Sequence, residues 1–127
     1  MHGKHSFEYA IIRIVPRVER EEFVNAGVIL YCRDLKFLDC RYVLNKEKLL
    51  ALCADADCCE IENYLQAFQK ICAGAKDGGP IAGLDPAGRF RWLTATRSTV
   101  LQCSKVHPGL CGHAPPMLES LMQNLVL

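Results

Sequence analysis

The sequence predicts an α+β fold, in which helices pack on one face of a single-domain antiparallel sheet of about five strands. Residues 9–44 hold two nearly apolar runs rich in β-branched residues and a third that alternates, as strands do. From residue 45 the apolar spacing changes to that of amphipathic helices. The expected order is β-β-β-α-α-β-β-α, and a length of 127 residues fits one domain over 1–127.

Composition excludes several classes of protein. The formal net charge of +1 argues against general nucleic-acid binding, which needs an excess of Lys and Arg. No apolar run reaches bilayer length, and the opening "MHGKHSFEYAIIRIVP" lacks the core of a signal peptide. We therefore expect a cytoplasmic protein that binds no membrane. In that compartment the eight cysteines are expected to be reduced and mostly structural.

The first two predicted strands form an antiparallel hairpin. "YAIIRIVP" is apolar on both faces except at Arg13, which indicates a central strand that ends at Pro16. If residues of like parity share a face, Arg13 lies opposite Asn25 of "FVNAGVILYC". The other register would leave a buried guanidinium without a partner, which is costly. Gly27 marks either a bulge or a close approach to the backbone.

The remaining elements follow from alternation, helix caps and turn residues. "KFLDCRYVL" alternates as a half-exposed edge strand does. Asn45 and Asp57 are expected to begin two helices, and Gly74 ends the second. "DGGPIAGLDPAG" has the composition of a surface loop. Pro115 and Pro116 suit the first turn of a last amphipathic helix.

The segment "RFRWLTATRSTVLQCS", residues 89–104, is predicted to form two strands. In that arrangement Phe90 and Trp92 point inward, and Arg89 and Arg91 point outward. The following stretch, "SKVHPGLCGHAPP", is expected to be irregular.

The same segment suggests a site for an anionic ligand. Guanidinium groups match the oxygens of carboxylates and phosphates, and hydroxyl groups stand beside them here. The alternative is a solvated strand face followed by ordinary turn residues. A P-loop is excluded because Leu84 and Asp85 stand where Lys and Ser or Thr are required. The ligand-binding candidates are Arg13, Asn25, Gly27, Arg91, Arg97, Ser98 and Thr99.

A second candidate site consists of nitrogen and sulfur ligands. Cys103, His107, Cys111 and His113 could complete a tetrahedral zinc site, although their spacing is not a standard one. The alternative is an exposed loop with solvated histidines. A thiolate beside His107 could also act as a nucleophile. No common catalytic motif is present, so a binding protein is expected rather than an enzyme, and no cofactor is expected.

Two stretches resemble the signature regions of the bacterial family called domain of unknown function 3037. They are "YAIIRIVPRVEREEFVNAGVILYC" and "RFRWLTATRSTVLQCSKVHPGL", and the resemblance covers nearly the whole chain. The family usually has a proline where Thr96 stands. By this resemblance the matching positions are Arg13, Asn25, Gly27, Arg91, Arg97 and Ser98. Members are often encoded beside HipA-like kinases, which implies a protein partner.

Three functional hypotheses follow. The leading one is a small, cytoplasmic, non-catalytic bacterial protein that binds or regulates a protein partner, for example a HipA-like kinase, and that can form a homodimer. The second is a module that binds an anion such as a nucleotide, a phosphate or an RNA end. The third is a metal or redox site at the Cys and His residues.

Overall fold

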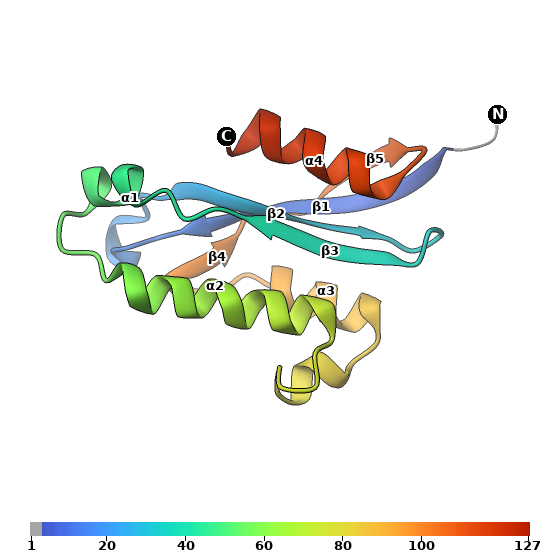
Figure 1. The fold of residues 1–127 in the computed structure, drawn as a ribbon, viewed down its shortest axis with the longest axis horizontal. Coiled ribbons are helices and arrows are strands. Elements are labelled where there is room, and N and C mark those ends of the chain that lie inside the picture. Colours follow the sequence, from blue (N-terminus) through green and yellow to red (C-terminus); the bar gives the residue numbers. More distant parts are fainter. Residues whose placement is uncertain (1–3) are drawn as a thin grey trace.

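The computed structural model describes residues 4–127, and in this part of the chain five strands form one antiparallel sheet (Figure 1). The strand order is β3-β2-β1, and both β4 and β5 pair with the remaining edge of β1. The α+β class and the antiparallel sheet are therefore confirmed. The strands are β1 (His5–Ile14), β2 (Val24–Cys32), β3 (Phe37–Tyr42), β4 (Leu101–Cys103) and β5 (His107–Cys111).

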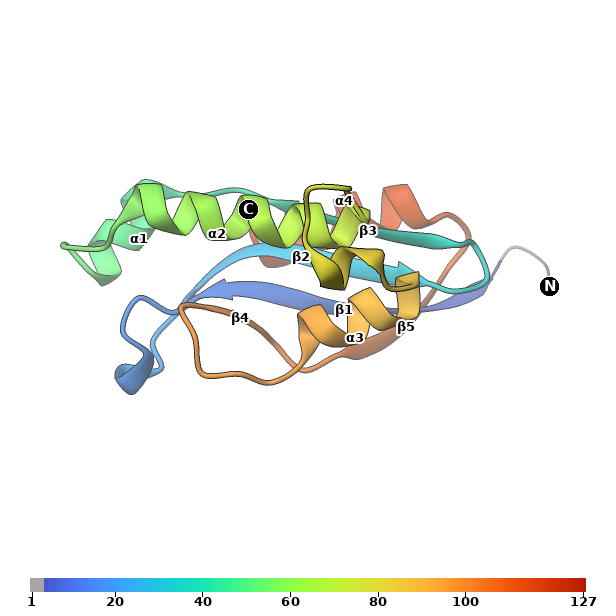
Figure 2. The same cartoon turned by 90° about the horizontal axis from the view of Figure 1, so that it is seen from below.

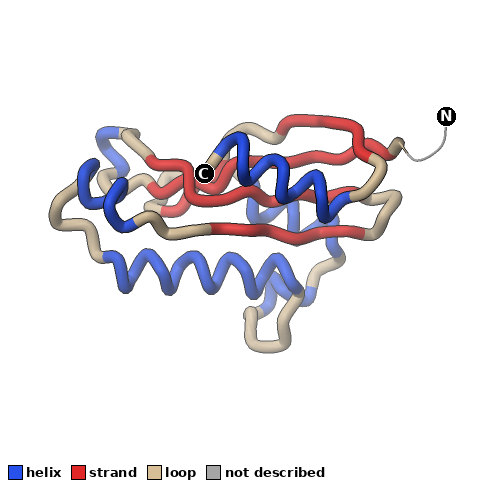
Figure 3. Tube along the Cα trace, turned by 45° about the horizontal axis from the view of Figure 1, so that its top comes forward, coloured by secondary structure: helices blue, strands red, loops and turns tan. Residues whose placement is uncertain are grey.

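The helices form layers on both sides of the sheet (Figures 1 and 3). They are α1 (Lys46–Leu52), α2 (Cys58–Ala73), α3 (Pro86–Thr94) and α4 (Ala114–Leu125), with short 3-10 turns at Val18–Arg20 and Pro80–Gly83. The predicted caps are confirmed, because Asn45 accepts from the Lys48 N–H and Asp57 from the Glu60 N–H. Within residues 4–127 no helix combines the length and the apolar character needed to cross a bilayer.

Strand β1 is buried on both faces, as its sequence predicts. Ala10, Ile12 and Ile14 are fully buried in the core that includes Leu65 of α2 and Phe90 of α3. On the other face, Phe7 and the partly buried Tyr9 pack in a second core with α4. Two separate cores therefore meet at this central strand.

Helix α4 differs from the expectation that the helices cover one face. Helices α2 and α3 share a face, whereas α4 covers the opposite one (Figure 1). The cause is the second face of β2, where Val28, Leu30 and Cys32 are fully buried and need an apolar cover. Leu118 and Met122 of α4 provide it.

The hairpin register is confirmed at two pairs and wrong at the others. Arg13 pairs with Asn25 as predicted, and Ile14 with Val24, but Ile12 pairs with Gly27 and the earlier pairs also join residues of unlike parity. Ala26 is the additional residue between these pairs, so β2 contains a bulge there. The bulge changes the parity relation along the hairpin, and the sequence gives no sign of it beyond the neighbouring glycine.

Residues 89–104 begin with a helix, not with the predicted strand. Asp85 accepts a hydrogen bond from the Gly88 N–H, and Pro86 occupies the first turn, so "DPAG" starts α3. Phe90 is buried as expected, but Trp92 is 39 % exposed because helical spacing turns it away from the core. The last two strands are β4, late in this segment, and β5, in the stretch that we expected to be irregular.

Replacement of Gly27 by alanine tests the tight contact between β2 and β3. A Cβ at this position would overlap with the carbonyl oxygen of Arg41 and lie 2.9 Å from the Tyr42 Cβ. Because backbone atoms cannot move aside, we expect Gly27→Ala to lower the free energy of unfolding by about 2 kcal/mol or more. Chemical denaturation measures this loss. Gly83→Ala is the control, since nothing lies within 4 Å of its Cβ position, and equal losses in the two variants would contradict the prediction.

Candidate functional site

Arg13 and Asn25 lie together at the C-terminal end of α4. The Asn25 amide donates to the Leu125 carbonyl at 3.2 Å, which satisfies one of the free carbonyls at a helix end. The Arg13 guanidinium lies 4.1 Å from the centre of the Phe23 ring. Among the described residues, no group bonds the buried Nε of Arg13 or the buried Oδ1 of Asn25. The sequence correctly predicts that Arg13 and Asn25 lie opposite each other. The Asn25 amide, however, already donates its hydrogen bond within the fold.

Arg91 does not join this pair. It donates two hydrogen bonds to Glu8, from Nη1 to Oε2 at 2.9 Å and from Nη2 to Oε1 at 2.7 Å. Glu8 and Arg13 are five residues apart on β1, or roughly 17 Å, and their opposite parity places them on opposite faces. The expected convergence of Arg13 with Arg91 in one pocket is therefore wrong.

The turn after α3 holds the other predicted ligand residues. The Arg97 guanidinium lies 4.3 Å from the centre of the Trp92 ring and donates to the Trp92 carbonyl. The Thr99 hydroxyl donates to the Leu101 carbonyl at 2.7 Å, and Ser98 is exposed. Within residues 4–127, Arg97 forms no ion pair. Its charge therefore remains open to a partner.

An apolar groove of about 220 Å³ is lined by residues of α2, β4 and the end of α3. We call it the α2–β4 groove, and Figure 2 shows the arrangement of these three elements. Among residues 4–127, Arg97 is the only charged residue along the groove, and Thr99 and Gln102 are its other polar members. Its apolar lining is Tyr64, Ala67, Phe68 and Ile71 of α2, Trp92 and Leu93 of α3, and Leu101 and Cys103 of β4.

Two aromatic residues of this groove are exposed, although Trp92 was predicted to point into the core. Tyr64 is 41 % exposed and Trp92 is 39 % exposed. Tyr64 follows the apolar spacing of α2 but lies at the edge of its buried stripe, which spacing alone does not reveal. Trp92 was misplaced because its segment was taken for a strand.

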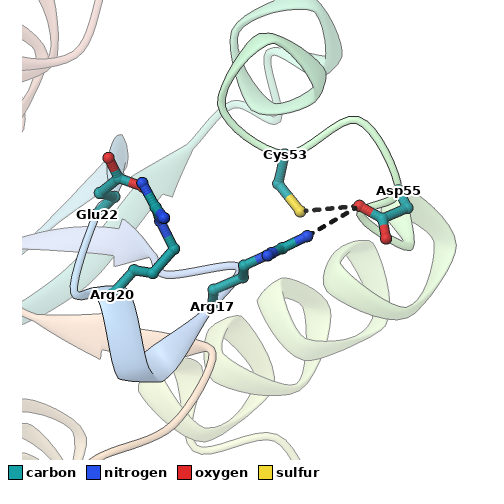
Figure 4. Close-up of polar contacts among 5 residues, drawn as sticks. All are labelled: Arg17, Arg20, Glu22, Cys53 and Asp55. Atoms are coloured by element: carbon teal, nitrogen blue, oxygen red, sulfur yellow. Dashed lines mark hydrogen bonds and ion pairs between the residues drawn. The ribbon is translucent and has the colours of Figure 1, made fainter.

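A second, polar cavity of about 230 Å³ continues from the groove, and Tyr64 lines both. In it the Cys53 thiol donates to Asp55 at 3.4 Å, and Arg17 lies 3.8 Å from the same carboxylate (Figure 4). The bond from Cys53 lowers the pKa of the Asp55 carboxyl most, followed by the backbone N–H of Asp55 and the charge of Arg17. Arg17 and Asp55 are exposed, so their pairing adds little stability. These residues line a polar cavity that adjoins the groove at Tyr64.

The predicted metal ligands lie apart. Cys103 pairs with Ile12 and Cys111 with His5, seven residues away along β1 or roughly 23 Å. The His107 ring packs against Tyr9 at 5.3 Å, and His113 is exposed just before α4. In the part of the chain that the structure describes, no three potential ligands form a group. The four-ligand site is therefore wrong, because β1 separates its members.

The Cys103 thiol is held in its protonated form. Burial raises its pKa to about 12, and the charges of Arg97 and Arg13 lower it by less. A thiol with this pKa carries about a thousandfold less thiolate near neutral pH than one at its usual value of 9.0. Its partner in the nucleophile hypothesis, His107, points to the other face of the sheet.

Alkylation of the native protein tests this description of the cysteines. At pH 8, iodoacetamide should modify the exposed Cys59 and leave Cys103 unmodified, as peptide mass spectrometry would show. In denaturant both thiols should react alike. Modification of native Cys103 as fast as Cys59 would contradict the assignment.

Comparison with known proteins gives one result. The family model described as protein of unknown function (DUF3037) matches residues 9–126. No curated protein and no solved structure matches this chain significantly. Both signature regions belong to the sheet. The first forms the hairpin β1–β2, and the second contributes β4 and β5, which both pair with β1. The chain therefore belongs to the DUF3037 family.

Proposed function

We propose that this protein is a non-catalytic, cytoplasmic bacterial binding protein that holds a segment of a protein partner in the α2–β4 groove. The observation that carries the proposal is the exposed Trp92, with Arg97 stacked on it, at the rim of an apolar groove. Trp, Tyr and Arg are the residues that most often dominate binding energy at protein interfaces. All three are present here.

The charge of the groove indicates the chemistry of the bound segment. Arg97 is fixed by its stacking and by its bond to the Trp92 carbonyl, and no carboxylate lines the groove. A fixed, unpaired guanidinium favours a carboxylate on the partner. The expected segment therefore has an apolar side chain, which packs on Tyr64 and Trp92, next to an Asp or Glu.

The family resemblance indicates which partner to test first. DUF3037 proteins are often encoded beside HipA-like kinases, so we take such a kinase as the partner. A second copy of this chain is the competing occupant, and the oligomeric state distinguishes the two.

Binding that does not involve catalysis agrees with the chemistry of the site. Cys103 lines the groove but is protonated by burial, and His107 lies on the opposite face of the sheet. In the adjoining polar cavity, the Asp55 carboxylate already interacts with Cys53 and Arg17. These residues therefore supply surface for recognition.

Substitution of Trp92 tests the groove. The protein and the neighbouring HipA-like kinase should co-elute at micromolar concentration, and calorimetry should give their dissociation constant. Because hot-spot truncation typically costs more than about 2 kcal/mol, Trp92→Ala should weaken binding by at least about tenfold. Arg97→Ala should also weaken it, by loss of the carboxylate contact.

Leu110→Ala is the matched control, because Leu110 is 61 % exposed and lies on β5, away from the groove. It should bind the kinase like the wild-type protein. Absence of co-elution, or an unchanged affinity for Trp92→Ala, would refute the proposal. A homodimer in light scattering that Trp92→Ala abolishes would instead assign the groove to a second copy of this chain.

A further inference from the structure

A separate cavity of about 680 Å³ lies at the other end of α3, where that helix begins beside the end of β2. No residue lines both this cavity and the α2–β4 groove, so the two sites are independent. Its polar lining is Glu8 of β1, Tyr31 of β2, Arg33 and Lys36 of the β2–β3 turn, and Asp85 and Arg91 of α3.

Tyr31 brings an unpartnered hydroxyl to this cavity. The residue is only 9 % exposed, and its ring packs 5.4 Å from that of Phe90. Its hydroxyl forms no hydrogen bond within residues 4–127, and both terminal nitrogens of the neighbouring Arg91 bond Glu8 instead. The hydroxyl therefore offers a donor to whatever occupies the cavity.

The bonds to Glu8 fix Arg91 in place and leave part of its donor capacity free. A guanidinium has five N–H groups, and Glu8 takes two of them. The Glu8 carboxylate neutralises the charge of Arg91 and raises its pKa. Arg91 thus contributes oriented donors, whereas net positive charge must come from elsewhere.

Arg33 and Lys36 supply that charge. Both are exposed, and neither forms an ion pair within the described residues, while Asp34 of the same turn lies 3.8 Å from His5. The turn closes through the Lys36 N–H and the Arg33 carbonyl at 3.1 Å. Lys36 has a φ of 52°, a left-handed conformation for which glycine or asparagine is preferred. Backbone conformation alone would therefore favour glycine, and the lysine contributes its ammonium group.

We propose that this cavity binds the phosphate group of a small phosphomonoester. Such a group carries about −1.5 to −2 charges at pH 7, which Arg33 and Lys36 offset in part, since Asp85 also lines the cavity. The Tyr31 hydroxyl and the free N–H groups of Arg91 can donate to its oxygens. Asp85 keeps its negative charge, but one oxygen of its carboxylate is directed at the start of α3, where it accepts from the Gly88 N–H at 2.8 Å. The site is formed by two strands, β1 and β2, together with the β2–β3 turn and α3.

The substitution Lys36→Gly separates binding from folding. It removes a cation that faces the phosphate and also relieves the left-handed conformation, so the variant should fold at least as well as the wild-type protein. The probes are inorganic phosphate, AMP and glucose 6-phosphate, titrated at constant ionic strength and followed by NMR. We expect saturable shifts in the wild-type protein and roughly tenfold weaker binding in Lys36→Gly.

Tyr31→Phe and Lys48→Gln complete the test. Tyr31→Phe removes only the unpartnered hydroxyl and keeps the ring on Phe90, so it should weaken phosphate binding several-fold without loss of stability. Lys48 lies on α1, at the opposite end of the sheet from the β2–β3 turn (Figure 1), and Lys48→Gln should leave the affinity unchanged.

Three results would overturn the phosphate site: no saturable binding of any of the phosphates, equal binding of acetate, or wild-type affinity in both Lys36→Gly and Tyr31→Phe. Tighter binding of AMP or of glucose 6-phosphate than of inorganic phosphate would support it and show which ester group the cavity prefers.

Discussion

The burial of strand β1 on both faces and along both edges determines the arrangement of the other elements. Ala10, Ile12 and Ile14 require one helical layer, and Phe7 requires another on the opposite side. Strand β2 occupies one edge of β1, and β4 and β5 share the other edge. The two signature regions are therefore neighbours because each supplies strands that a central apolar strand needs for its hydrogen bonds.

This central strand also separates the polar residues. Side chains of even and odd number point to opposite faces of β1, so Glu8 meets Arg91 under α3 while Arg13 lies with Asn25 near the end of α4. A single arginine pocket cannot form. Helix α3 instead contributes to two surfaces, because successive helical residues point about 100° apart. Trp92 lines the α2–β4 groove, and Arg91 lines the cavity beside the β2–β3 turn.

The sequence predicts those features that depend on local chemistry. Helix caps at Asn45 and Asp57, the end of α2 at Gly74 and the burial of β1 all follow from residue type and spacing. The bulge at Ala26 follows only in part, because Gly27 indicates a bulge or a close approach nearby, whereas the position of the bulge depends on how β2 meets its neighbours. Helix α3 was missed because its aromatic and arginine residues alternate over a short stretch, although Asp85 and Pro86 mark its start. The sequence identifies single residues of the candidate site but not how they are grouped. Tyr64 and Trp92 are exposed because of the way their helices pack, and residue spacing does not reveal this.

We propose that the α2–β4 groove binds the partner, whereas the Arg13–Asn25 pair has a structural role. Hydrogen–deuterium exchange of the protein alone and in complex with a HipA-like kinase tests this division most directly. We expect slower exchange on complex formation in residues 64–71 and 92–103, with unchanged exchange in α4. Protection of α4 and of the strand ends around Arg13 and Asn25, with none along the groove, would contradict it.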